Sequence, residues 1–430
     1  MKACGGCHRL FDDTSGFCPV DGTKLDPVSP LAFPKDPEDK RIGKRTCNRY
    51  VLFRRVADGG MGRVYQALDD QAERSVALKI LHPEVAQDAV SVERFKREFE
   101  VSTSLKHPHI VDVIGFERTE DASYALIMEY LEGEELRMLL KRDKTLRPER
   151  VIRMVSQVAA GLTAAHERRQ VHRDLKPDNL FLCHTQDGDI TKILDFGSVR
   201  DNSENAKKLT VMGTTIGSPF YMPPEQAQGL PSLDHRADIW SLAAIVYECL
   251  TGKVPFAGST GPAILLAILT QDPPPISEAG KEQGVPPTLD EVIEVALAKN
   301  HEIRQPSIGA FADALGHAYG LPGDHHAWAS TPEAELTRLV AENLPRKLEA
   351  HQAKAAGAFP ELDAAVAAPA SGAPGSGHAL TAQRPSRASA TLPDDLVVMG
   401  LPPERPTWFW PAIGGGALFV VALLAFLLTR

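Results

Sequence analysis

Four side chains that could do chemistry lie near the middle of the chain: two carboxylates, one ammonium group and one amide. They are Asp174, Lys176, Asn179 and Asp195. Apolar runs, among them Leu180-Phe181-Leu182, separate the segments that carry them. A strand–loop–strand arrangement would bring all four side chains together at the opening of one cleft. Carboxylate and amide oxygens there could hold a hard divalent cation, and the ammonium group could neutralise negative charge.

The four residues belong to two longer motifs, His172-Arg173-Asp174-Leu175-Lys176-Pro177-Asp178-Asn179 and Asp195-Phe196-Gly197. Together these motifs resemble the catalytic and metal-binding loops of protein kinases, where H-R-D-x-x-x-x-N and D-F-G recur. The lysine that follows the first aspartate by two positions is similar to the serine/threonine branch of that family. D-F-G alone is a common tripeptide, but both motifs in this order are specific.

The resemblance implies a role for each of the four side chains. Asp174 would accept or orient the proton of a substrate hydroxyl, and Lys176 would neutralise charge on the transferred γ-phosphoryl group of ATP. Asn179 and Asp195 would bind Mg²⁺, or Mn²⁺ in its place. The implied activity is phosphoryl transfer from ATP to serine and threonine hydroxyls of protein substrates.

A glycine-rich segment lies upstream and is similar to the kinase loop G-x-G-x-x-G-x-V. Its glycines, Gly59 and Gly62, would let backbone N–H groups reach phosphate oxygens. Ala57 stands at the first glycine position, where its methyl group disfavours positive φ and bears on nucleotide affinity more than on chemistry. A plain hairpin turn has the same composition. The apolar run Val76-Ala77-Leu78-Lys79-Ile80 that follows favours the kinase interpretation.

Lys79 lies inside that apolar run, where a charge needs a partner. Apolar residues downstream recur at helical spacing and predict a helix from 92 to 105: Val92, Phe95 and Phe99. Glu98 lies in the middle of this helix and matches the family's helix glutamate. Without Lys79, Glu98 would be interpreted as a solvent-exposed charged residue on an amphipathic helix. Glu93 and Glu100 remain alternatives.

The resemblance also implies an ATP site between two lobes. The runs 107–111 and 124–130 would complete a five-stranded small lobe, and a long helix through Val151 and Ala165 would lead into the catalytic loop. Met128 resembles the gatekeeper, and Gly133 would let the hinge turn. The implied ATP-contacting residues are Val56, Ala57, Gly59, Gly62, Val64, Ala77, Lys79, Met128, Glu129 and Leu131.

A polar loop from Ser198 to Glu225 follows D-F-G and ends in a segment similar to G-T-x-x-Y-x-A-P-E. Ser218 and Pro223 replace threonine and alanine there. The guanidinium group of Arg173 would favour a nearby anion, and a phosphorylated loop would supply one. The candidate autophosphorylation sites are Thr210, Thr214 and Thr215. The resemblance also implies that Asp238 braces the catalytic loop and that Arg304 pairs with Glu225.

The N-terminal residues Cys4, Cys7, Cys18 and Asp21 predict a small zinc-ribbon-like module that binds Zn²⁺. Asp21 stands where a fourth cysteine is expected, and His8 is another candidate ligand. Two alternatives stay open, an unmetallated or redox knuckle and a c-type haem signature. The haem signature would require export of the N-terminus, which conflicts with an ATP-using domain just downstream.

The C-terminal part changes in composition. Residues 317–407 read as a tether, with one solvated helix from Pro332 to Gln352 and then an Ala/Pro/Ser/Gly-rich stretch. The uncharged apolar run 408–428 is long enough for one transmembrane helix, although a buried C-terminal helix is the alternative. We expect a single-pass tail anchor in the bacterial inner membrane. The use of ATP would place the kinase domain in the cytoplasm, and no N-terminal signal peptide is expected.

The expected organisation is a module at 1–25, a linker at 26–48, an α+β bilobal kinase domain at 49–316, the tether and the membrane helix. A net charge of −9 argues against nucleic-acid binding. Pairing of two chains would allow trans-autophosphorylation. The alternatives to an active, signalling kinase are a catalytically weak pseudokinase scaffold, suggested by Ala57 and Pro223, and a zinc-ribbon adaptor.

Overall fold

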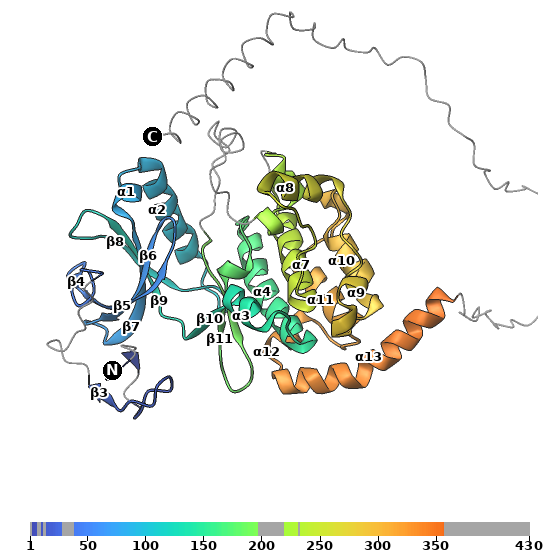
Figure 1. Cartoon of the computed structure of the whole chain (residues 1–430), viewed down its shortest axis with the longest axis horizontal. Coiled ribbons are helices and arrows are strands. Elements are labelled where there is room, and N and C mark those ends of the chain that lie inside the picture. Colours follow the sequence, from blue (N-terminus) through green and yellow to red (C-terminus); the bar gives the residue numbers. More distant parts are fainter. Residues whose placement is uncertain are drawn as a thin grey trace, which may run out of the picture. The chain divides into compact units, whose positions relative to one another are not determined.

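The computed structural model describes residues 2–6, 10–11, 14–27, 38–196, 219–230 and 233–356. The chain divides into two compact units, 1–361 and 362–430. All the described residues lie in the first unit (Figure 1). In that part of the chain, no helix is both long and apolar enough to cross a membrane. The predicted membrane helix, 408–428, lies outside the described residues.

A six-stranded antiparallel sheet with the order β4-β5-β6-β7-β9-β8 forms the first lobe. Most apolar side chains of this sheet are buried. Helix α2 packs against β8 and β9 (Figure 1). The elements are β4 (Arg45–Thr46), β5 (Tyr50–Asp58), β6 (Gly62–Asp69), β7 (Arg74–Leu81), α1 (Pro83–Ala86), α2 (Ala89–Ser104), β8 (Val113–Arg118) and β9 (Tyr124–Glu129).

This sheet differs from the expected five strands in two places. Arg45–Thr46, expected to be linker, pairs with Tyr50–Val51 and adds an edge strand. The strand expected at 107–111 lies instead at Val113–Arg118. Pro108 has no N–H to offer a strand partner, and the segment turns there, with Ile110 N–H donating to the His107 carbonyl oxygen.

The second lobe is mainly helical, with α4 and the almost fully buried α7 at its centre. A three-stranded sheet of order β10-β11-β12 carries the loops toward the first lobe. Its elements are β10 (Gly133–Glu135), α3 (Leu136–Asp143), α4 (Pro148–Glu167), β11 (Leu180–Cys183), β12 (Ile190–Ile193), α6 (Pro224–Ala227), α7 (Arg236–Thr251), α8 (Gly261–Thr270), α9 (Ile276–Ala279), α10 (Asp290–Ala296) and α11 (Ile308–Ala318). Short 3₁₀ turns lie at Pro177–Asn179, Pro219–Tyr221, Lys281–Gln283, Pro287–Leu289 and His301–Ile303.

Two more helices, α12 (His325–Ser330) and α13 (Glu333–Ala355), pack onto the second lobe. The helix expected at Pro332–Gln352 is present as α13, but it is not solvated along its whole length. Trp328 of α12 and Leu336 and Val340 of α13 are buried in the core cluster of the lobe. The apolar residues of α13 recur at a spacing that puts them on one face of the helix, although charged residues lie between them in the sequence. This apolar face packs the first half of α13 against α4. The domain boundary expected at residue 316 falls within α11.

The N-terminal segment forms a three-stranded antiparallel sheet in the order β2-β1-β3. Its strands are β1 (Lys2–Cys4), β2 (Leu10–Phe11) and β3 (Leu25–Pro27). Four side chains form its small core: Cys4, Phe11, Cys18 and Leu25. Cys7 and His8 lie outside the described residues. A core this small is rarely enough to stabilise a fold without a metal or another cross-link.

Candidate active site

The catalytic-loop residues lie together between α4 and β11. Lys176 Nζ lies 2.7 Å from Asp174 Oδ2, and Asn179 donates from Nδ2 to the Asp174 carbonyl oxygen at 2.7 Å. This bond orients the amide, so that its oxygen is left to accept or to bind a cation. The three side chains therefore present a carboxylate, a cation and a ligand oxygen at one place, in a loop that follows a helix rather than the expected strand.

Lys79 connects the two lobes through two carboxylates. Its Nζ lies 3.0 Å from Glu98 Oε1 on α2 and 2.9 Å from Asp195 Oδ1. Glu98 is 7% exposed, and burial together with nearby Asp195 raises its pKa to about 7. Burial also acts to raise the pKa of Asp195, but Lys79 beside it holds that pKa below its usual value. One ammonium group thus serves two carboxylates.

A buried aspartate stabilises the backbone of the catalytic loop. Asp238, at the start of α7, is 0% exposed. It accepts hydrogen bonds at 2.9 Å from the backbone N–H groups of His172 and Arg173, and its Oδ2 lies 2.8 Å from Nε2 of His166. Arg173 and Asp195 have positive φ, 66° and 55°. Such strained backbone persists only where the surroundings hold it, and Asp238 does so at Arg173.

The glycine-rich segment forms the hairpin between β5 and β6. Ala57 lies within β5 opposite Val64 and is not among the residues with positive φ, so its methyl group causes no backbone strain. Gly62 is needed for packing, because a Cβ there would overlap the backbone of Ile80 on β7. His82 Nε2 lies 2.8 Å from the Gly59 carbonyl oxygen and so contacts the hairpin tip, a role that the sequence pattern did not indicate.

The implied nucleotide-contacting residues lie partly in one cluster. Ala77 on β7 and Met128 on β9 are cross-strand neighbours, and Val64 and Leu131 pack on the same apolar cluster. Val56 stands apart, 43% exposed on β5. The Glu129 side chain accepts from Lys192 Nζ at 2.7 Å, which links the hinge to β12 of the second lobe.

Gly133 permits the turn into β10. Its φ is +153°, and a Cβ there would overlap the carbonyl of Leu182 on β11. This close approach of two strands agrees with the expectation that the hinge needs a glycine.

The end of the polar loop is anchored by a buried ion pair. Arg304 donates to Glu225 from two nitrogens, at 2.7 and 2.8 Å. Arg137 on α3 adds a second anchor, with 2.6 Å to the Tyr221 hydroxyl and 3.1 Å to Glu248. The pattern of the sequence did not single out Arg137, because its partners are distant in the chain. Gly197 and the candidate sites Thr210, Thr214, Thr215 and Ser218 lie outside the described residues.

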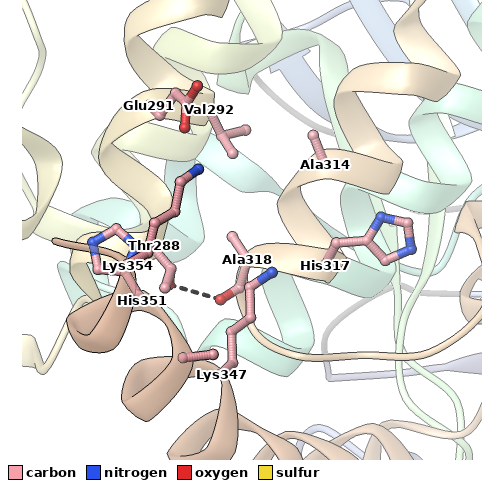
Figure 2. Close-up of a pocket in the computed structure, with 10 residues that line it drawn as sticks. Thr288, Glu291, Val292, Ala314, His317, Ala318, Lys347, His351 and Lys354 are labelled. Atoms are coloured by element: carbon pink, nitrogen blue, oxygen red, sulfur yellow. Dashed lines mark hydrogen bonds between the residues drawn. The ribbon is translucent and has the colours of Figure 1, made fainter. Parts of the chain in front are cut away.

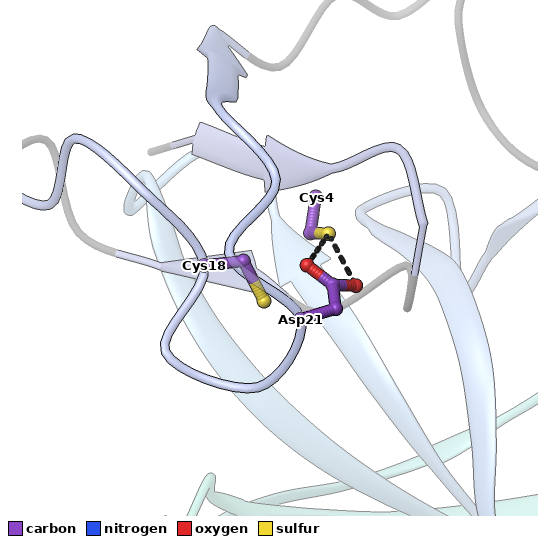
Figure 3. Close-up of side chains that lie close together, drawn as sticks. All are labelled: Cys4, Cys18 and Asp21. Atoms are coloured by element: carbon purple, nitrogen blue, oxygen red, sulfur yellow. Dashed lines mark hydrogen bonds between the residues drawn. The ribbon is translucent and has the colours of Figure 1, made fainter.

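A second group of ligand-type side chains lies in the N-terminal sheet. The side-chain ligand atoms of Cys4, Cys18 and Asp21 lie within 4.8 Å of one another (Figure 3). Both cysteines are buried, at 1% and 2% exposure. Backbone N–H groups point at each sulfur, from Gly6 to Cys4 Sγ at 3.3 Å and from Val20 to Cys18 Sγ at 3.4 Å. Hydrogen bonds from Thr23 lower the pKa of Asp21.

Comparison with known proteins decides the family. The protein kinase domain family matches residues 50–319. The chain belongs to the protein kinase family. Two serine/threonine-protein kinases are similar to it: pkn3 of Myxococcus xanthus, 34% identical over 72% of this chain and 56% of its own length, and PknD of Mycobacterium tuberculosis, 33% identical over 87% and 57%. This kinase thus spans little more than half the length of these relatives.

A solved structure agrees with this family assignment. The kinase domain of Mycobacterium tuberculosis PknI, crystallised as a double mutant, has a TM-score of 0.50 and 27% identity. The match covers 64% of this chain and 97% of that one. The two-lobed kinase fold, with a β-rich first lobe and a helical second lobe, is therefore the fold of this protein, in its bacterial serine/threonine branch.

Proposed function

We propose that this kinase transfers the γ-phosphoryl group of ATP to serine or threonine hydroxyls of proteins. The observation that carries the proposal is the joint placement of Lys79, Glu98 and Asp195 with the Asp174–Lys176 pair. Mg²⁺, when bound, would neutralise phosphate charge, and Asn179 and Asp195 are the residues that would hold it. Asp174 would take or orient the hydroxyl proton, and Lys176 would stabilise charge on the transferred group.

The test is phosphate incorporation by the purified full chain with ATP and Mg²⁺, followed by intact mass and with a generic protein substrate. We expect Asp174→Asn to lower the rate by about 10²–10⁴-fold, the usual contribution of a positioned proton acceptor. Asp143→Asn, an exposed change on α3, should leave the rate unchanged. No incorporation by either the wild type or the control would overturn the proposal and favour the pseudokinase scaffold.

We further propose that the loop 198–218 is autophosphorylated in trans by a second copy of the chain. Support comes from Arg173, whose Nε is buried and has no hydrogen-bond partner among the described residues. A buried guanidinium favours an anion, which a phosphothreonine would supply. Phosphopeptide mapping should find phosphate on Thr210, Thr214 or Thr215. If all three threonines were unmodified in active protein, the proposed autophosphorylation would be refuted.

We also propose that the N-terminal module binds one Zn²⁺ through Cys4, Cys18 and Asp21, with Cys7 as the expected fourth ligand. The donors fit the ion, because two buried sulfurs and a readily ionised carboxylate lie within one coordination sphere. Backbone N–H groups directed at both sulfurs would stabilise thiolates. These contacts favour a metal site over a redox knuckle, and the haem alternative has no supporting contact among the described residues.

Metal analysis of the purified full chain tests the zinc site. We expect about one zinc per chain in the wild type, and its loss in Cys4→Ser or Cys18→Ser, because three ligands hold structural zinc poorly. Cys183→Ser removes a thiol on β11 of the kinase domain, outside the proposed ligand set, and should retain the metal. Wild-type protein without zinc, or full retention in Cys4→Ser, would contradict the assignment.

The membrane anchor remains a proposal that the apolar run 408–428 supports. In this arrangement the kinase domain would face the cytoplasm, where ATP is available, at the bacterial inner membrane. Its substrates would be cytoplasmic proteins or the cytoplasmic parts of membrane proteins in a signalling process.

A further inference from the structure

A hollow of about 330 Å³ lies between α10, α11 and the second half of α13 (Figure 2). Lys347, His351 and Lys354 line it from α13, and Val292, Ala314 and Ala318 are among the residues that line it from the lobe. It is far in the sequence from the catalytic loop, and nothing in the proposed phosphoryl transfer uses it. The volume is that of a small-molecule site.

A proline inside α13 turns the helix toward this hollow. Pro345 has no N–H for the preceding turn, and helices bend at such positions. Figure 1 shows α13 changing direction along its length. Before the bend, Leu336 and Val340 are buried against the lobe. After it, the helix presents side chains to the hollow instead of packing closely.

Three basic residues follow the bend at helical spacings of four and three, so they share one face. The side chains of Lys347, His351 and Lys354 make no ion pair or hydrogen bond with another described residue, whereas Arg338 on the same helix pairs with both Glu335 and Glu342. Figure 2 shows the ammonium groups of Lys347 and Lys354 pointing into the hollow.

The opposite wall offers little to neutralise these cations. Glu291 is the one acidic residue in the lining, and it lies at the upper rim near Lys354 (Figure 2). The Thr288 hydroxyl already donates to the Ala318 carbonyl oxygen at 2.7 Å. His317 lies 2.8 Å through Nε2 from the Gly323 carbonyl oxygen. This local excess of positive charge occurs in a chain with a net charge of −9.

We propose that this hollow is an anion site that binds a phosphate group carried on a small apolar or neutral body. The two ammonium groups would hold the phosphate oxygens, the imidazole of His351 would add a donor when protonated, and the alanine and valine side chains would contact the body. A soluble phosphate ester and the headgroup of an anionic phospholipid share this chemistry. Binding would fasten the second half of α13 to the kinase lobe.

Hydrogen–deuterium exchange of residues 345–355 in the purified full chain tests the proposal. The probes are sn-glycerol 3-phosphate, and vesicles of phosphatidylcholine with or without phosphatidylglycerol. We expect saturable protection of this segment by the phosphate ester if the source is soluble, or by the phosphatidylglycerol vesicles alone if the source is lipid. A lack of protection by every probe would overturn the proposal.

Charge reversal separates a specific site from general attraction. Lys347→Glu and Lys354→Glu should each weaken the protecting effect by about tenfold or more, since a charge-assisted contact contributes at least that factor. Arg346→Glu makes the same charge change one residue away, outside the lining, and should leave the affinity unchanged. An equal loss in Arg346→Glu would show diffuse attraction only, and overturn the site. Kinase activity is not the readout, so this test stands apart from that of the proposed function.

Discussion

At the scale of single residues, the ammonium group of Lys79 lies between a carboxylate on α2 and the carboxylate of Asp195. The buried carboxylate of Glu98 and the partly exposed one of Asp195 approach one ammonium group, and like charges so close cannot both ionise freely. Asp195 keeps its charge beside Lys79, while the pKa of Glu98 rises to about 7. In the absence of a metal ion, Glu98 is therefore the group that takes up a proton near neutral pH.

This cluster predicts a pH-dependent stability. The pKa of Glu98 rises from 4.5 to about 7 on folding, so between these values the folded state binds more protons than the unfolded state. Stability contributed by Glu98 is therefore greatest at low pH and falls as pH rises through this window. Urea unfolding from pH 5 to 8 without Mg²⁺ should show a shallower fall in Glu98→Gln.

Glu100→Gln is the matched control, because Glu100 lies on the same helix but is exposed, and its ion-pair partner within the described part of the chain is the exposed Lys96. Its pH profile should follow that of the wild type. If Glu98→Gln and the wild type had profiles of equal slope, the raised pKa of Glu98 would be refuted.

At the scale of elements, α12 and α13 are part of the second lobe rather than a tether. Trp328 lies 2% exposed in the core cluster and its indole N–H donates to the Pro322 carbonyl oxygen at 2.9 Å. Gly316 on α11 makes room for the ring, since a Cβ there would overlap it. The lobe thus extends beyond residue 319, where the family match ends.

Substitutions at this contact should destabilise the kinase domain. We expect Trp328→Ala to lower the free energy of unfolding by about 3–5 kcal/mol through loss of buried surface and an unfilled cavity. Gly316→Ala should lower it by about 1–3 kcal/mol through overpacking. Chemical denaturation of the full chain measures both.

Leu266→Ala is the control for these two variants, because Leu266 is 59% exposed on α8. It should change the free energy of unfolding by no more than about 0.5 kcal/mol. A Trp328→Ala variant as stable as this control would mean that α12 does not pack on the lobe in solution.

At the scale of the whole molecule, three parts of different composition follow one another along the chain. The cysteine-bearing module and the kinase domain are described by the structure, whereas the apolar run 408–428 is known from the sequence. That run contains no charged residue, and Trp408 and Trp410 lie at its start. Tryptophan is enriched where transmembrane helices meet the membrane interface.

Removal of residues 408–430 tests the proposed anchor. Cell fractionation of a bacterial host should place the full chain in the membrane pellet and the shortened chain in the soluble fraction, because no other apolar run of that length remains. Phosphate incorporation by the shortened chain should be retained. An unchanged distribution between the fractions would refute the anchor and favour the buried-helix alternative.

Local sequence was sufficient where chemistry depends on fixed spacing. Asp174, Lys176 and Asn179 lie within six positions of one short loop. Glu98 was assigned through its match to the family's helix glutamate, with Lys79 as the expected partner, whereas the apolar periodicity predicted only the helix. The kinase family and its two-lobed fold followed from these motifs. Gly133 was also recognised as the residue that lets the hinge turn, although its close approach to Leu182 on β11 is seen only in the structure.

Tertiary structure alone decided those contacts between distant residues that no family motif covers. The sequence could not show that His166 binds Asp238, that Arg137 reaches Tyr221, or that Arg45–Thr46 joins the sheet, because each depends on how separate elements pack. Burial of Trp328 and Leu336 likewise required the lobe surface that receives them. Periodicity within one segment specifies which face is apolar, but the partner of that face is set by the packing of the whole domain.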